Sequence, residues 1–246
     1  MARRAQGTGR AKPRTLFACL AVVLLAALGW MGGGGPGPYE PSTVSAVMDL
    51  AEKVPSWTGG PYVDTSGCPG ALDVSLDKPR RASGQDYPPL DALGRCGPCT
   101  AVVSRDTMPT EKRGSIGMVR PSGWHTVRMD GLVDGGYLYN RCHLIGYQLT
   151  GQNANEENLV TGTRYLNVEG MLPWENRVAD YVEGTGGEVL YRVTPLFVGE
   201  ELVCRGVRMQ AVSLHDEGAG LSFDVFCPNV QPGVSIDYAT GEAQRI

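Results

Sequence analysis

Hydrophobic residues gather in three segments near the carboxyl end of the chain, and polar residues separate them. These segments, 189–198, 202–214 and 221–230, are divided by short polar turns that contain glycine and acidic residues. Such apolar runs are typical of strands, and short turns join antiparallel neighbours. The pattern therefore predicts an antiparallel meander. Further strands are expected over 101–104, 124–129 and 137–139, with brief candidates at 61–63 and 72–76.

A different period marks the segment 167–183, where apolar residues recur at the spacing of a helix. Pro173 comes early enough in this segment to be accommodated in the first turn. A second, shorter helix is expected over 43–54, where threonine and serine precede an apolar stripe. The chain contains no visible internal repeat, and about 190 residues are enough for one domain with a full hydrophobic core.

The first 31 residues predict an export signal. A basic stretch ends at Arg14, and the apolar run after it has about 15 residues, which suits the core of a signal peptide better than a membrane span of about 20. The alternative is an uncleaved N-terminal membrane anchor, which would be the chain's sole contact with a membrane. In either case the rest of the chain is expected outside the cytoplasm, either secreted or anchored on the outer face of the cytoplasmic membrane. Residues 32–42 are expected to be a Gly/Pro linker and 43–246 a single domain.

Seven cysteines are present, and Cys19 lies in the export segment. An even number of cysteines in an exported domain predicts up to three disulfides. Cys204 and Cys227 are the favoured pair, because they fall on consecutive predicted strands and could face each other across a hairpin. The partners of the remaining four are left open: Cys68, Cys96, Cys99 and Cys142.

The motif Cys96-Gly-Pro-Cys99 offers another interpretation, a thiol oxidoreductase whose first thiol has a lowered pKa. Such a site needs a strand before the motif and a helix after it. In this chain a β-branched run, Thr100 to Val103, follows the motif, so the strand is on the wrong side. A structural role for the two cysteines is therefore favoured.

Three histidines are candidates for acid–base chemistry. His215 lies in a polar turn and is expected to be exposed, and His125 is expected to have a surface or packing role on its short strand. His143 differs, because a strand gives way there to an apolar stretch and a cluster of amides follows. Amide oxygens bind hard cations and orient other side chains. Together with Glu175 on the predicted helix, this pattern indicates metal-assisted hydrolysis with His143 as the base. The alternative is a set of Asx turns around a buried histidine.

Several blocks of sequence, in order, carry a likeness to a known family. They include Arg113-Gly-Ser-Ile-Gly117, Asn140-Arg-Cys-His-Leu-Ile-Gly-Tyr-Gln-Leu149, Asn158-Leu-Val-Thr-Gly-Thr-Arg-Tyr-Leu-Asn167 and Met171-Leu-Pro-Trp-Glu175. Through them the chain resembles the DNA/RNA non-specific endonucleases of the ββα-metal (His-Me finger) group, and within that group the streptodornase and DNA-entry nuclease branch. The likeness is strongest over 94–241. It implies an α+β fold in which a central antiparallel sheet is flanked by helices and long loops.

The resemblance also implies roles for individual residues. His143 matches the general base, Asn167 the amide that binds the metal, and Glu175 the acid that orients metal-bound water. The implied metal is Mg²⁺, with Mn²⁺ as the alternative. On a continuous helix, Asn167 and Glu175 are separated by about 12 Å of rise and about 80° of rotation, so both border one cleft. Weaker assignments give a catalytic role to Arg141, substrate binding to Arg164 and Arg177, and supporting roles to Asn140, Asn155 and Asn158.

The residues beside the base depart from the commonest family signature, Asp-Arg-Gly-His. Asn140 removes a carboxylate, and Cys142 replaces a glycine. Four residues after Glu175, where some relatives carry an arginine, this chain has Ala179. Charge stabilisation of the transition state from that position is therefore in doubt.

The sequence thus predicts an exported, Mg²⁺-dependent endonuclease that cuts DNA without sequence preference and leaves 5′-phosphate ends; whether RNA is also a substrate is left open. The distribution of charged residues limits how tightly this chain is expected to bind nucleic acid. Residues 1–38 hold five of the 22 basic residues and no acidic one, so 17 basic and 26 acidic side chains remain. That excess of acid argues against tight, stationary binding to nucleic acid. The alternative is a catalytically silent surface module that binds nucleic acid or serves in DNA uptake, and no protein partner is inferred.

Overall fold

The computed structural model describes residues 54–73, 77–79 and 84–246. All of them belong to one compact unit, Glu40–Ile246. The expected export segment, the linker and all but the last residue of the helix expected over 43–54 lie outside the described residues. Within the described part of the chain, no helix is both long enough and apolar enough to cross a membrane.

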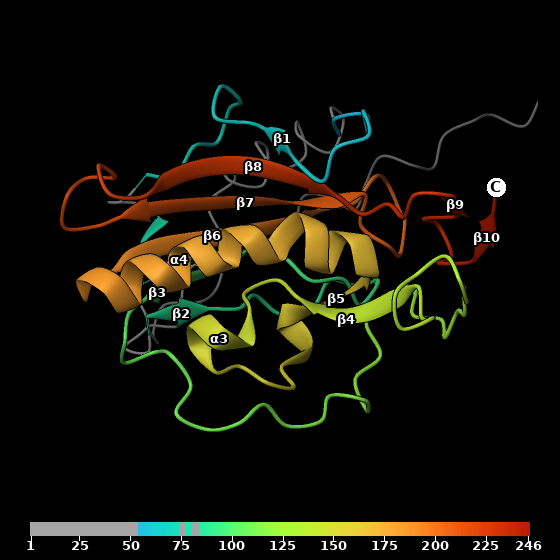
Figure 1. Ribbon diagram of the computed structural model, residues 1–246, viewed down its shortest axis with the longest axis horizontal. Helices are drawn as coiled ribbons and strands as arrows, with labels where there is room; N and C mark the ends of the chain where they lie inside the picture. Colours follow the sequence, from blue (N-terminus) through green and yellow to red (C-terminus); the bar gives the residue numbers. More distant parts are fainter. Residues whose placement is uncertain (1–53, 74–76, 80–83) are drawn as a thin grey trace, which may run out of the picture. The chain divides into compact units, whose positions relative to one another are not determined.

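A six-stranded antiparallel sheet forms the centre of this unit (Figure 1), with strand order β1-β8-β7-β6-β3-β2. Among its three long strands, β6 pairs with β7 and β7 pairs with β8, which confirms the predicted meander. The strand expected over 101–104 is also present, as β3. The strands are β1 (Val63–Asp64), β2 (Gln85–Asp86), β3 (Cys99–Val103), β6 (Val189–Leu196), β7 (Gly206–Ser213) and β8 (Ser222–Pro228).

A separate hairpin and the helix that follows it form a ββα unit. The two strands of the hairpin pair in antiparallel register. A π-helical turn then continues without a break into the longest helix, which is capped at its C-terminal end by Gly186, whose φ of 72° favours glycine. The elements of this unit are β4 (Tyr139–His143), α3 (Tyr147–Thr150), η1 (Glu156–Asn158), β5 (Leu159–Thr163), η2 (Leu166–Met171) and α4 (Leu172–Thr185).

The main hydrophobic core lies between the sheet and α4, which runs along the sheet in Figure 1. Val178 and Val182 are buried on one stripe of the helix, where they join a cluster that contains Tyr191 of β6 and Met209 of β7. Glu175 occupies the same buried stripe, three residues before Val178. The packing that holds α4 on the sheet therefore also places a carboxyl group in a buried position.

Two predicted strands differ from the structure. Segment 124–129 forms no strand and contributes one isolated bridge, from Arg128 to Tyr137. The strand expected over 137–139 is β4, which begins at Tyr139 and runs on to His143. The physical reason is that 124–138 folds as a loop whose apolar side chains form a small second core, which also includes Val234. The C-terminal hairpin of β9 (Val234–Ile236) and β10 (Ala243–Arg245) completes that core.

The brief candidate at 61–63 corresponds only in part to the two-residue β1, and the candidate at 72–76 lies partly outside the described residues.

The expected disulfides are not formed. In the structure Cys204 precedes β7, and Cys227 lies opposite Val207 in the ladder, so the favoured pair do not face each other across the strands. The cysteines of the described residues are all free thiols: Cys68, Cys96, Cys99, Cys142, Cys204 and Cys227.

The thiols of the Cys-Gly-Pro-Cys motif are directed at backbone carbonyls. Cys96 donates to the carbonyl of Leu159 at 3.2 Å, and Cys99 donates to that of Glu157 at 3.4 Å. Burial raises the pKa of Cys96 to about 12. A redox-active thiol needs a lowered pKa. The structure therefore favours a packing role for this motif.

Candidate active site

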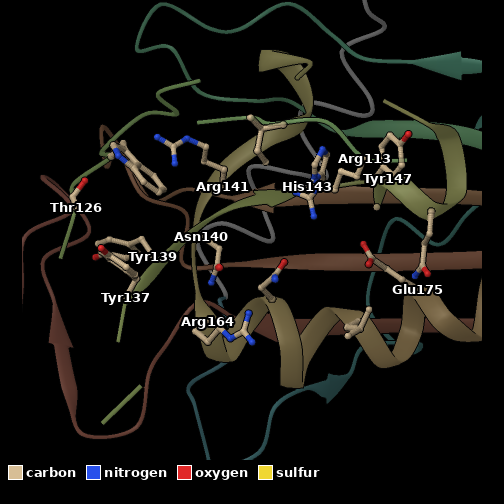
Figure 2. A pocket seen from close by; sticks show the side chains of 16 residues that line it. Arg113, Thr126, Tyr137, Tyr139, Asn140, Arg141, His143, Tyr147, Arg164 and Glu175 are labelled. Atoms are coloured by element: carbon tan, nitrogen blue, oxygen red, sulfur yellow. Dashed lines mark hydrogen bonds between the residues drawn. The ribbon is translucent and has the colours of Figure 1, made fainter. Parts of the chain in front are cut away.

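A cleft of about 690 Å³ extends along β4, between the loop that contains Arg113 and the first turns of α4. Polar and aromatic side chains line it. Figure 2 shows Glu175 and Tyr147 at one end and Tyr137 and Tyr139 at the other, with His143, Arg141 and Asn140 between them.

His143, the last residue of β4, is only 6% exposed. Its Nε2 lies 2.8 Å from the backbone oxygen of Asn153, and its Nδ1 lies 3.2 Å from Nη2 of Arg113. A carbonyl can only accept and a guanidinium can only donate, so these partners assign the proton to Nε2 and the lone pair to Nδ1. Burial and the charge of Arg113 lower the pKa of His143 to about 4. The ring is therefore neutral and able to accept a proton near neutral pH.

Asn158 fixes the backbone just beyond His143. Its buried side chain accepts from the amide of Ile145 at 2.8 Å and donates to the carbonyl of the same residue at 2.9 Å. Asn155 acts locally, since its side chain caps η1 by accepting from the amide of Glu157 at 3.0 Å. Both expected supporting amides thus order the segment after the base, and neither of them lines the cleft.

Glu175 lies across the cleft from the base, on α4, and is 9% exposed. Burial raises the pKa of its carboxyl group to about 7, although a hydrogen bond from the backbone of Gly146 and the charge of Arg113 oppose this rise. A Cβ atom at position 146 would come within 2.7 Å of Oε2 of Glu175. Glycine at that position therefore leaves the space that the carboxyl group occupies.

Asn167 lies in the π-helical turn η2, and its Oδ1 accepts the thiol of Cys142 at 3.1 Å. The wider π turn changes the phase between Asn167 and Glu175, so the rotation expected for one continuous α-helix does not apply. Both side chains nevertheless line the same cleft. The predicted helix is confirmed in its extent, and its first turns have a different geometry.

The oxygen atoms of Asn167 and Glu175 form a donor set that fits a hard divalent cation. Carboxylate and amide oxygens are ligands of Mg²⁺, which usually keeps several waters and takes few protein ligands. Among the described residues, no three His, Cys, Asp or Glu side chains cluster as a metal site. A largely hydrated cation suits this cleft better than a fully protein-coordinated one.

Arg141 and Arg164 both line the cleft, as expected, and differ in how freely they can move. Nε of Arg141 donates to the carbonyl of Val119 at 2.6 Å, and its guanidinium stacks on Trp124 at 4.0 Å from the ring centroid. The side chain of Arg164 forms an exposed ion pair of 3.3 Å with Asp134, its one side-chain partner within the described residues. Because exposed pairs contribute little free energy, Arg164 is the more available of the two for a phosphate.

Asn140 also lines the cleft, and its Nδ2 is shielded from solvent with no hydrogen-bond partner in the described chain.

Arg177 is not brought together with His143. Its guanidinium stacks on Trp174 at 4.7 Å and on Phe223 at 5.6 Å, beside a second hollow at the edge of β8. Two residues along a helix correspond to a rotation of roughly 200°, so Arg177 lies on the opposite side of α4 from Glu175. Its expected role in substrate binding at this cleft has no support from the geometry.

Sequence reasoning assigned no role to Arg113, although this residue opens one of the blocks that carry the family likeness. The structure places its guanidinium against Nδ1 of His143, and its charge acts on Glu175 as well. Arg113 and His143 are 30 residues apart in the sequence, so spacing gave no sign of their contact. The position of Arg113 at the start of a matching block was the one sequence feature that could have indicated a role.

The family model for DNA/RNA non-specific endonucleases matches residues 77–214, more than half of the chain. The chain belongs to the DNA/RNA non-specific endonuclease family. It is therefore a nuclease, and the expected family is confirmed.

Solved structures of nucleases share the fold of this endonuclease. NucA from Streptococcus agalactiae with magnesium bound gives a TM-score of 0.66 at 24% identity, over 82% of this chain and 95% of that one. The Sda1 nuclease with bound zinc gives 0.57 at 27% identity, over 66% and 81%. A structure described as an extracellular endonuclease gives 0.53 at 21% identity, over 77% and 100%. These likenesses confirm the α+β, ββα-metal fold class.

Proposed function

We propose that this endonuclease uses Mg²⁺, or alternatively Mn²⁺, to hydrolyse phosphodiester bonds of DNA and RNA without sequence preference, leaving 5′-phosphate ends. One observation carries the proposal: the cleft brings together His143, whose lone pair is on Nδ1, and the oxygen donors of Asn167 and Glu175. The magnesium in NucA and the zinc in Sda1 support a divalent cation at this site.

In this proposal His143 is the general base. The carbonyl of Asn153 holds Nε2–H, so Nδ1 accepts the proton of the attacking water. The lowered pKa of His143 keeps the ring unprotonated before each turnover. Asn158 keeps the end of β4 in place through its two hydrogen bonds to Ile145, which holds the base in position.

Asn167 and Glu175 would hold the cation, directly or through its waters, and the cation would stabilise the charge that develops on the phosphate and the leaving 3′ oxygen. Glu175 must be ionised for this role; burial raises the pKa of the metal-free carboxyl group to about 7, and a divalent cation beside it would favour the ionised form. Gly146 leaves room for its carboxyl group beside the cleft.

Arginines supply the attraction for phosphate that the acidic chain as a whole lacks. Arg113, Arg141 and Arg164 line the cleft with a single carboxylate, Glu175. On substrate binding, Arg113 exchanges its contact with Nδ1 of His143 for a phosphate oxygen, which frees the base. Local positive charge within an acidic protein agrees with weak, salt-sensitive substrate binding.

The enzyme is further proposed to act outside the cytoplasm, with residues 1–31 as a signal peptide or anchor, 32–42 as a linker and 43–246 as the nuclease domain. Its resemblance to structures described as an extracellular endonuclease and an extracellular nuclease supports this location.

The proposal is tested by incubating plasmid DNA and a structured RNA with the purified protein in Mg²⁺, Mn²⁺ or EDTA. Cleavage with either cation and none in EDTA is expected. Asn167→Ala should raise the cation concentration needed for half-maximal rate, whereas Gln244→Ala, an exposed amide on β10, should leave it unchanged. Cleavage in EDTA, or equal cation dependence in the two variants, would contradict the proposal.

A further inference from the structure

Three aromatic side chains besides Tyr147 line the cleft: Trp124, Tyr137 and Tyr139. Figure 2 shows Tyr137 and Tyr139 at the end opposite Glu175. Two of these rings are already engaged. The guanidinium of Arg141 covers Trp124 at 4.0 Å. Tyr139 is buried, and its hydroxyl donates to the carbonyl of Gly241 at 3.0 Å. Tyr137 differs from both, because its side chain remains 48% exposed while it lines the cleft.

Tyr137 contacts Arg128 of the same loop through both its ring and its backbone. Arg128 lies over one face, 4.8 Å from the centroid, and Asp130 in turn binds the guanidinium of Arg128. The backbones of Arg128 and Tyr137 form an antiparallel bridge, which Leu138 extends by donating to the carbonyl of residue 127 at 3.0 Å. The part of the ring that Arg128 does not cover is therefore an exposed aromatic surface that lines the cleft.

Positive charge accompanies this surface. Arg164 lines the same cleft, and its backbone amide donates to the carbonyl of Leu138, the residue after Tyr137, at 2.8 Å. Its partner Asp134 is highly exposed. An aromatic face beside a guanidinium that only an exposed carboxylate engages resembles the combination with which proteins bind single-stranded nucleic acid, one group stacking on a base and the other binding a phosphate.

We propose that Tyr137 is a stacking platform for an unpaired nucleobase and that the cleft consequently prefers single-stranded polynucleotides to duplexes. This inference rests on the proposed endonuclease function. A base within a duplex is stacked and paired on its own strand, so it cannot offer a free face to Tyr137 without unstacking. An unpaired base can do so, and Arg164 is placed to bind a neighbouring phosphate.

The platform lies well away from the position of the reacting phosphate. His143 is four residues beyond Tyr139 along β4, which corresponds to about 13 Å of strand, and Tyr137 lies at the same end of the cleft as Tyr139 in Figure 2. A small diester bound at His143 cannot reach Tyr137. Loss of the ring should therefore affect long substrates and spare small ones.

The test compares the whole protein with Tyr137→Ala, Tyr137→Phe and Leu132→Ala, the last being a control in the same loop for damage unrelated to the platform. Substrates are a fluorescein-labelled oligothymidylate, the same strand annealed to its complement, and bis(p-nitrophenyl) phosphate. Stacking on one aromatic residue corresponds to about a tenfold change in binding. Tyr137→Ala should raise KM for the single strand about tenfold with kcat unchanged. It should leave the duplex and the small diester unaffected, and Tyr137→Phe should behave as wild type.

Anisotropy of the labelled single strand in EDTA measures the same contact without cleavage. Weaker binding by Tyr137→Ala than by Leu132→Ala is expected. Equal losses on all three substrates, or unchanged binding and KM, would overturn the platform. Absence of hydrolysis of any substrate by the wild type would instead refute the proposed function, and the binding comparison would still decide the role of Tyr137.

Discussion

Replacing Glu175 with glutamine should stabilise the metal-free protein at alkaline pH and, at the same time, reduce cleavage. Burial raises the pKa of this carboxyl group from its ordinary value of 4.5 to about 7. The folded protein therefore holds a proton that the unfolded chain releases. The contribution of this group to stability is fully present below pH 4.5 and is lost as the pH rises through about 7.

The magnitude follows from the same two values. At 1.36 kcal/mol per pH unit, the interval from 4.5 to about 7 corresponds to a loss of about 3 kcal/mol above pH 7. Glutamine has no charge to bury and keeps an oxygen that can accept from the backbone of Gly146, so the variant avoids this loss. His143 contributes with the opposite sign, since its lowered pKa gives stability that is lost as the pH falls towards 4. That contribution is common to both proteins and cancels when they are compared at one pH.

The assay is urea unfolding of wild type and Glu175→Gln in EDTA at pH 4.5, 6 and 8.5. The variant should be similar to wild type at pH 4.5 and more stable by up to about 3 kcal/mol at pH 8.5. Cleavage by the variant in Mg²⁺ should fall at every pH. A difference in stability that does not change with pH would refute the assignment of a buried, proton-holding carboxyl group at position 175.

Three further predictions concern Asn158, Gly146 and the cysteines. Asn158→Ala should lower the free energy of unfolding by about 3 kcal/mol, because two buried backbone groups of Ile145 lose their partners; a loss below about 1 kcal/mol in urea unfolding would contradict this. Gly146→Ala should lower kcat about 100-fold by displacing the carboxyl group of Glu175, whereas Gly184→Ala, whose Cβ meets nothing within 4 Å, should leave kcat unchanged. The melting temperature should not depend on dithiothreitol, because the described thiols are free; a marked drop under reducing conditions would show that disulfides form.

The three long strands were predictable because each is rich in apolar residues and a short polar turn joins it to the next, so both their existence and their pairing followed. Burial itself does not separate them from the strand that was missed, since nearly all residues of β6 and β7 are buried as well. β5 (Leu159–Thr163) gave a weaker signal, because it has only five residues and contains Gly162. The prediction of a strand over 124–129 was wrong, because the apolar residues of this segment pack in a loop against the C-terminal hairpin.

Site residues that lie in sequence motifs could be predicted. Features of the site that depend on tertiary packing could not. His143, Asn167 and Glu175 lie in ordered blocks of sequence, and the structure brings them to one cleft. The phase of the π-helical turn, the contact of Arg113 with the base and the position of Arg177 outside the cleft depend on how α4 and the long loop pack. The expected disulfides rested on cysteine parity, and strand register places Cys227 opposite Val207.

The central claim is that His143 is the base of a phosphodiester hydrolase, and plasmid nicking in Mg²⁺ by wild type, His143→Ala and His125→Ala tests it most directly. His125 is an exposed histidine whose ring contacts the carbonyl of Thr240 outside the cleft. Removal of a general base typically costs 10²- to 10⁴-fold in rate. We predict a loss of about that size for His143→Ala and none for His125→Ala. Equal nicking rates in wild type and His143→Ala would contradict the account.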